Sequence, residues 1–327
     1  MPSAEPLVRV VRSGVEESAH LGHVAVCDAS GKLLAWAGDP TREVFVRSCT
    51  KPVQAAVSLA SIGPGPGISN ELIAIMCASH NGEPVHVRAV RAVLRRGGID
   101  EGELRTPPAR PSDAASAVGV RTPRPVFHNC SGKHAGMLLA CASRGWAMPT
   151  YRSRGHPLQR RVLAAVRDLS GVRDVRIGVD GCGVPVHGMP LRAVAAMYAR
   201  LADPGSQGQL AEPVERAVTA MRAEPYLVGG RRRVDTAIMQ ASSDLVAKEG
   251  AEALDCAVSL DAGIGVAVKV ADGGYRAAGP ALVAVLSQVG LLDQVAGRAL
   301  RDLASPTVQG GGRPVGTIEP VVRLRRR

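Results

Sequence analysis

The chain makes almost all of its positive charge with arginine, and three of its few lysines lie where an amine could do chemistry. Only five of the 40 basic residues are lysines, and lysine, unlike arginine, can lose its proton and act as a base or a ligand. The first of the three is Lys51, in the motif SCTK at positions 48–51. A helix that starts here places the Ser48 hydroxyl one turn before the Lys51 amine, and the positive end of the helix dipole favours the neutral amine. The motif predicts Ser48 as a nucleophile and Lys51 as its base, although a helix-capping serine followed by a first-turn lysine would have the same pattern.

A second polar motif, CASHNGE at positions 77–83, ends an apolar helical segment. It presents a hydroxyl, an imidazole and an amide in succession, from Ser79, His80 and Asn81. This density of functional groups is unusual in a segment that only turns the chain, so these three residues are candidate site residues. A polar helix end closed by Gly82 is the simpler interpretation.

The second special lysine, Lys269, interrupts an apolar strand predicted over 265–270. Its neighbours two residues away are alanines, which would leave room for a cavity. Lysine is also common on edge strands, where its charge opposes aggregation, so the position alone does not decide the role. Lys32 and Lys248 lie at turns or segment ends and are expected to be exposed.

The third lysine, Lys133, belongs to a motif that could bind a metal ion. HNCSGKH at positions 128–134 and DGCG at positions 180–183 each place a cysteine in a polar, glycine-containing turn. Thiolates at Cys130 and Cys182 could bind zinc. The third ligand would come from His128, His134 or a deprotonated Lys133.

In order along the chain, SCTK, the motif around Ser79 and the strand lysine Lys269 resemble the three motifs of serine β-lactamases and penicillin-binding transpeptidases. The third motif differs, because KVA at positions 269–271 replaces the Lys-Thr/Ser-Gly of those enzymes. The closer resemblance is to the class 3, Rhizobium-type (thermolabile-type) L-asparaginases. It rests on CASHNGE at 77–83, HNCSGKHAG at 128–136, DGCG at 180–183 and LVAKEGAE at 245–252.

This resemblance implies a β-lactamase-like fold, usually dimeric, that hydrolyses L-asparagine to L-aspartate and ammonia. Transferred residue by residue, it implies two serine-lysine pairs, Ser48 with Lys51 and Ser79 with Lys269. Ser48 would be acylated, with Ser79 as the other candidate. It also implies a zinc site made of Cys130, Lys133, Cys182 and a water. The expected substrate-binding residues are Arg47, Asp180, His80 and Asn81, with Arg47 for the α-carboxylate and Asp180 for the amino group or the metal-bound water.

The distribution of apolar residues predicts an α/β (α+β) fold whose two ends share one antiparallel sheet. Strands are expected at 7–11, 22–27, 33–36, 44–46, 175–179, 254–260 and 265–270. Helices are expected from Pro52 onward and at 69–79, 84–96, 132–144, 156–169, 190–202, 209–222, 234–242 and 280–292. We expect a single domain over 1–318, with the sheet from 1–50 and 250–275, a helical region over 51–245 and an irregular loop at 98–125. Residues 319–327 are expected to form an unstructured basic tail.

Charge and composition argue against the other classes of protein. The net charge of +11 would suit a nucleic-acid-binding protein, but seven of the arginines lie in the run 231–233 and in the last five residues, and without them the net charge is +4. Aromatic residues are only 2%, too few to stack nucleic-acid bases. No apolar run reaches the roughly 18 residues that span a bilayer, and no export signal is evident. We therefore expect a cytoplasmic enzyme with reduced cysteines. The alternatives are an acyl-serine hydrolase for another amide or a β-lactam and a basic, non-enzymatic nucleic-acid-binding protein.

Overall fold

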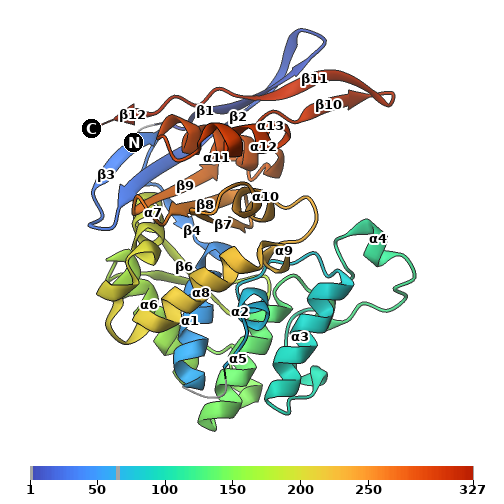
Figure 1. The fold of residues 1–327 in the computed structure, drawn as a ribbon, viewed down its shortest axis with the longest axis vertical. Coiled ribbons are helices and arrows are strands. Elements are labelled where there is room, and N and C mark those ends of the chain that lie inside the picture. The colour runs from blue at the N-terminus through green and yellow to red at the C-terminus, as the bar shows by residue number, and fades with distance from the viewer. Residues whose placement is uncertain (1–2, 64–66, 327) are drawn as a thin grey trace.

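A nine-stranded sheet built from both ends of the chain forms the upper layer of the molecule in Figure 1. The computed structural model describes residues 3–63 and 67–326. The sheet runs in the order β10-β11-β1-β2-β9-β8-β7, with β3 paired to β2 and β12 paired to β3. Its strands are β1 (Glu5–Arg12), β2 (Val15–Asp28), β3 (Leu33–Ala37), β7 (Leu245–Gly250), β8 (Leu254–Ser259), β9 (Ile264–Val270), β10 (Thr307–Gly310), β11 (Arg313–Pro320) and β12 (Arg325–Arg326).

Every pairing in this sheet is antiparallel, as predicted. The central pairing joins β2 to β9 and sets His23 opposite Lys269. Because β2 comes from the start of the chain and β9 from near its end, the sheet closes the fold between the two termini. The predicted fold class, a mixed α/β fold with a shared terminal sheet and a helical middle, is confirmed.

The expectation of an unstructured basic tail was wrong. β11 pairs with β1, and the last strand, β12, pairs with β3 so that Arg325 lies opposite Trp36. Arg325 also forms an ion pair with Glu5 on β1. Arg325 and Arg326 therefore belong to a sheet edge, where charged side chains oppose edge-to-edge association.

A second, three-stranded sheet lies beside the helices and has the order β4-β6-β5. It contains β4 (Glu43–Phe45), β5 (Arg176–Val179) and β6 (Pro185–Pro190). The strand predicted at 44–46 belongs here and not to the main sheet, because β4 pairs with β6. The small sheet thus joins two segments that are far apart in sequence and that both lead into candidate site motifs, at Ser48 and at Cys182.

The helical region lies below the main sheet in Figure 1. It contains α1 (Lys51–Ile62), α2 (Asn70–Met76), α3 (Pro84–Arg96), α4 (Ala114–Ala117), α5 (Ser131–Arg144), α6 (Pro157–Ser170), α7 (Leu191–Ala199), α8 (Ala211–Ala223), α9 (Pro225–Val228) and α10 (Val234–Ala241). The predicted helices at 84–96, 132–144 and 156–169 agree with the observed bounds to within one residue. The C-terminal helices are α11 (Tyr275–Gln288), α12 (Gln294–Ala299) and α13 (Arg301–Ala304). Helix α11 begins five residues before the predicted start at Pro280, which lies inside the helix.

Helices cover both faces of the middle of the main sheet. α7 packs on β9 and β2, while α11 packs on β9 and β11. All six residues of β8 are buried, as expected for a strand with protein on both sides. Among the described residues, no helix has the length and apolar character to cross a membrane.

One glycine allows the helices that carry the site motifs to meet closely. A Cβ at Gly132, in the first turn of α5, would lie only 2.0 Å from the Ile75 carbonyl oxygen on α2. Any side chain here would force the start of α5 away from the end of α2. This contact brings the motif at 128–134 beside the motif at 77–83.

Candidate active site

A short 3-10 helix, η1 (Arg47–Thr50), connects β4 to α1 and carries Ser48. Arg47 has a φ of 50°, a left-handed conformation that is strained in a residue with a side chain and that is found mostly at functional sites. The Cys49 thiol fixes η1 to the main sheet by donating to the carbonyls of Lys248, at 3.2 Å, and Leu254, at 3.1 Å. Ser48 is therefore held at the end of β7.

Lys51, the first residue of α1, is fully buried. Its Nζ lies 2.7 Å from the Ser79 Oγ and 2.6 Å from the Ala78 carbonyl. Burial lowers the pKa of Lys51 to about 8, and the positive charges of Lys133 and Lys248 act in the same direction. A substantial fraction of this amine is thus neutral near physiological pH, as a general base requires.

The two serines of the site differ in accessibility. Ser79 is only 2% exposed, whereas Ser48 is half-buried. Ser79 is fixed by its contact with Lys51 and by a backbone hydrogen bond from its N–H to the Val228 carbonyl. Within residues 3–63 and 67–326, no hydrogen bond engages the Ser48 Oγ. The accessible serine is therefore unengaged, and the inaccessible one is held against the amine.

The structure does not bring Lys269 to Ser79, so the predicted pairing of these residues was wrong. Lys269 Nζ donates to the backbone carbonyls of Glu252 and Val270. Among the described residues, Ser79 is hydrogen-bonded to Lys51 and not to Lys269. Lys269 lies on β9, on the far side of β8 from β7, and this is why it cannot reach the buried serine.

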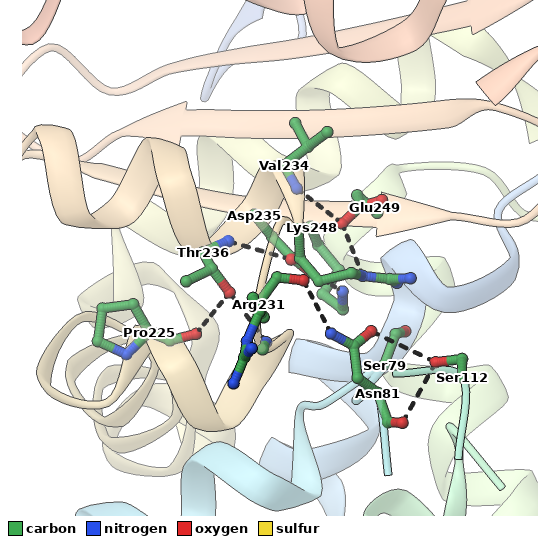
Figure 2. Close-up of polar contacts among 12 residues, drawn as sticks. Ser79, Asn81, Ser112, Pro225, Arg231, Val234, Asp235, Thr236, Lys248 and Glu249 are labelled. Carbon is green, nitrogen blue, oxygen red and sulfur yellow. Dashed lines mark hydrogen bonds and ion pairs between the residues drawn. The ribbon is translucent and has the colours of Figure 1, made fainter. Parts of the chain in front are cut away.

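The lysine beside the site is Lys248, which the sequence interpretation placed at the surface. It lies on the edge strand β7 and is 1% exposed, and its amine forms an ion pair with the fully buried Asp235. Figure 2 shows Lys248 and Asp235 pointing toward each other above Ser79 and Asn81. The signal that could have revealed it was the apolar run before it, LVA at 245–247, which is a short buried strand.

Lys248 belongs to a cluster of buried charges. Arg233 forms an ion pair with Glu249 at 3.0 Å, and Asp255 lies on the neighbouring strand β8. Burial raises the pKa of Glu249 to about 7 and raises that of Asp255 well above its usual range, with Asp235 adding to both shifts. Two cations thus face three carboxyl groups. Burial and this excess of carboxyl groups over cations both favour a proton on one of the carboxyls.

His80 and Asn81 act mainly as fixed supports. His80 Nδ1 accepts from the Gly82 N–H, and its Nε2 lies 2.9 Å from the Ser131 Oγ. Burial lowers the pKa of His80 well below its ordinary value. Asn81 donates to the Arg231 carbonyl at 2.9 Å, a contact drawn in Figure 2. Both side chains are buried, and their contacts hold Ser79 in place between α5 and the segment before α10.

The predicted metal ligands lie together. Atoms of Cys130, Asp180 and Cys182 that could bind a metal lie within 4.8 Å of one another, and Lys133 Nζ lies 3.1 Å from the Cys182 sulfur. Two sulfurs with a nitrogen and a carboxylate oxygen, all buried or partly buried, form a donor set that suits zinc. Asp180, predicted to bind substrate, thus joins the metal group, whereas His128 and His134 are not part of it among the described residues.

Positive charge around this group favours a thiolate. A hydrogen bond from the Cys182 thiol lowers the pKa of Cys130 well below its ordinary value, and the nearby Lys51 and Lys133 lower it further. Asp180 Oδ1 accepts a hydrogen bond from Arg47 Nε at 2.7 Å. The metal group is therefore joined directly to η1, through the residue that precedes Ser48.

The model of the L-asparaginase II family matches residues 8–320. The chain belongs to this family. It is an amidohydrolase, as predicted, and L-asparagine is the substrate that the family implies. No curated protein matches the sequence.

Two of the solved structures similar to this amidohydrolase are described as β-lactamases. A β-lactamase from Mycobacterium bovis is 16% identical, with a TM-score of 0.41 over 86% of this chain and 95% of that chain. A β-lactamase-like protein of Bacteroides dorei is 12% identical, with a TM-score of 0.45 over 82% of this chain and 93% of that chain.

Proposed function

We propose that this L-asparaginase II protein hydrolyses the side-chain amide of L-asparagine to L-aspartate and ammonia through an acyl-enzyme on Ser48. The observation that carries the mechanism is the buried Lys51 amine, held 2.7 Å from Ser79 Oγ and one turn after Ser48. A neutral amine that holds the Ser79 hydroxyl and follows Ser48 by three residues can take a proton from Ser48 as it attacks and exchange a proton with Ser79.

In the first step, Ser48 Oγ attacks the amide carbon while its proton passes to Lys51 Nζ. The N–H groups at the start of η1 have no partner within that helix, so the Ser48 N–H is available to stabilise the oxyanion. When the C–N bond breaks, a proton passes from Lys51 through Ser79 Oγ to the leaving nitrogen, which departs as ammonia. The product of this half-reaction is an ester of Ser48.

In the second step, Lys51, now neutral again, takes a proton from a water that attacks the ester carbon. Collapse of the intermediate returns the proton to Ser48 Oγ and frees aspartate. Lys248 contributes by position: its positive charge, held by Asp235, helps to keep Lys51 neutral. Lys51 is therefore the general base in both steps.

We further propose that Cys130, Cys182, Lys133 and Asp180 hold a zinc ion. When bound, the ion supplies a fixed positive charge that polarises or orients a substrate group. Arg47, hydrogen-bonded to Asp180, holds η1 at a fixed distance from this group. His80 and Asn81 position Ser79.

Three expectations accompany this function and stay predictions: a homodimer, a cytoplasmic location and a single catalytic domain over 1–318. Glutamine is a further candidate substrate. A pocket distinguishes compounds that differ by one methylene by only about 1–3 kcal/mol.

The test is ammonia release from L-asparagine by the zinc-loaded protein and by Ser48→Ala, with Ser58→Ala as the matched control. Ser58 lies on the same helix as Lys51 and donates only to the Gln54 carbonyl, so its loss should leave the rate unchanged. We expect Ser48→Ala to lose activity at least 1,000-fold, as expected for a missing nucleophile. Mass spectrometry of protein quenched during turnover should place an aspartyl group on the Ser48 peptide.

Two outcomes would contradict the mechanism. An aspartyl adduct on Ser79 would reverse the roles of the serines, and full activity in Ser48→Ala would remove the acyl-enzyme. Turnover of nitrocefin without ammonia release from asparagine would favour a β-lactam-hydrolysing function instead.

A further inference from the structure

Lys51 is the partner of Ser79 that Lys269 was first expected to be, yet Lys269 lines a cavity of its own. This cavity, of about 280 Å³, lies between β2, β9 and the segment that leads into η1. Arg47, the residue before Ser48, forms part of its wall. A ligand in the cavity would therefore contact the residue that precedes Ser48.

Three side chains in the wall can each donate a further hydrogen bond to a ligand. Lys269 Nζ donates to two backbone carbonyls, and an ammonium has three N–H groups, so one is left. Arg42 also lines the cavity, and no ion pair or hydrogen bond engages its guanidinium within the described part of the chain. His23 Nδ1 accepts from the Asp39 N–H, so the neutral ring carries its proton on Nε2.

The charges at this cavity suit the carboxylate of an amino acid. Burial lowers the pKa of His23, and the positive charges of Arg42 and Lys269 contribute to this shift, so the ring is a neutral donor between two cations. One of the two acids in the wall, Glu43, is already bound by Arg176 at 2.6 Å. The other, Glu252, has a carboxylate without an ion pair in the described residues. The wall thus combines donors for an anion with one free carboxylate for an ammonium.

Backbone strain gathers at the same cavity. Among the described residues, five that are not glycine have a positive φ, and Arg47, Glu252 and Ala253 are three of them. Lys269 Nζ binds the Glu252 carbonyl and so supports the strained turn between β7 and β8. Such strain is retained mostly at ligand sites, where it holds groups in place before the ligand arrives.

We propose that this cavity is the substrate's α-carboxylate subsite: Lys269, Arg42 and His23 bind the carboxylate and Glu252 binds the α-ammonium, while the side-chain amide extends past Arg47 to Ser48. This inference rests on the proposed function and deepens it, because it assigns the groups that recognise an α-amino acid. It also gives Lys269 a binding role in place of the predicted catalytic one.

The test compares two substrates, L-asparagine and 3-aminopropanamide, which is asparagine without its α-carboxylate. The variants are Lys269→Gln and Arg42→Gln, and Arg95→Gln, an exposed arginine on α3, is the matched control for lost charge. Loss of one charge-assisted hydrogen bond should raise KM for asparagine about tenfold or more, with a smaller change in kcat. Turnover of 3-aminopropanamide, slow in the wild type, should not change in any variant.

A merely structural role for Lys269 or Arg42 would lower turnover of both substrates equally, and that result would overturn the proposal. Inhibition by L-aspartate gives a second readout that does not depend on the slow substrate. It should be competitive, and its inhibition constant should rise about tenfold in Lys269→Gln. Non-competitive inhibition would assign the cavity to a second, regulatory molecule and would also overturn the proposal.

A separate binding measurement tests the cavity even where the proposed reaction does not occur. If the wild type releases no ammonia from asparagine, calorimetry with L-aspartate still tests the cavity. Binding that weakens in Lys269→Gln but not in Arg95→Gln would support the subsite without the reaction. Equal binding by all three proteins would exclude it.

Discussion

Lys51 Nζ lies 2.7 Å from Ser79 Oγ, although the two residues are 28 positions apart. The contact joins the start of α1 to the segment after α2, and the amine is enclosed on all sides. Ser48, on the turn before Lys51, is open enough for a substrate. The site therefore has one base for two hydroxyls, of which only one is accessible.

The first prediction concerns Lys51→Met, which replaces the amine by an uncharged chain of similar length. We expect kcat to fall about 10²- to 10⁴-fold, because this is the usual contribution of a general base. Stability should not fall, since a buried cation without a carboxylate partner is replaced by an apolar group. Steady-state ammonia release and urea unfolding measure the two effects. Activity within tenfold of the wild type would exclude Lys51 as the base.

The second prediction is the pH dependence of the wild type. The folded pKa of Lys51 is lowered to about 8 by burial, and only the neutral amine can accept a proton. kcat/KM should therefore rise with pH, with an inflection near 8, and level off above it. Initial rates from pH 6 to 9.5 at constant ionic strength measure this. Lys51→Met is the control: an inflection at the same pH in its residual activity would assign the titration to another group.

The third prediction concerns the buried pair of Lys248 and Asp235. Removing one partner leaves an uncompensated charge in the interior, so Lys248→Met should destabilise the fold by about 3–5 kcal/mol. The double variant Lys248→Met with Asp235→Leu removes both charges and should recover most of this loss. Chemical unfolding of the three proteins provides the free energies. Additive losses in the double variant would show that the two side chains act independently.

The fourth prediction concerns the metal group. Cys182→Ser and Cys130→Ser should each lose bound zinc, and Asp180→Asn should bind it more weakly, because each removes or weakens a donor. Zinc content after dialysis, measured by elemental analysis, tests this without an activity assay. Cys141→Ser, at a buried thiol outside the metal group, should keep the wild-type content. Retention of zinc by Cys182→Ser would place the ion elsewhere.

Much of the fold could be predicted because hydrophobic periodicity is a local property. The amphipathic pattern of α3 and α5 is visible in short windows, and their observed bounds agree with it to within one residue. β2 was predicted only over 22–27, and it begins seven residues earlier, at Val15. β7 was missed because its six residues are all buried and so show no alternation. β11 and β12 were missed for another reason: β11 contains two prolines and a glycine, β12 has only two residues, and both pair with strands from the start of the chain.

The residue types of the site were also visible in the sequence. Ser48, Lys51 and Ser79 were identified from spacing, and the thiols of Cys130 and Cys182 from their polar turns. In each case the motif is local, and the chemistry depends on the residue type. The scarcity of lysine in an arginine-rich chain made Lys51 and Lys133 conspicuous.

The partners of these residues were decided only by the tertiary structure. Lys269 and Lys248 lie on strands of the same sheet, and no local pattern says which strand ends beside η1. The order β9-β8-β7 decides it, because strand order depends on long-range pairing and not on the residues around each lysine. For the same reason the sequence could not show that Asp180 lies among the metal ligands or that Lys269 lines a cavity. The sequence by itself determined the helices, most of the strands and the chemical groups available, and the packing of distant segments determined which of those groups meet.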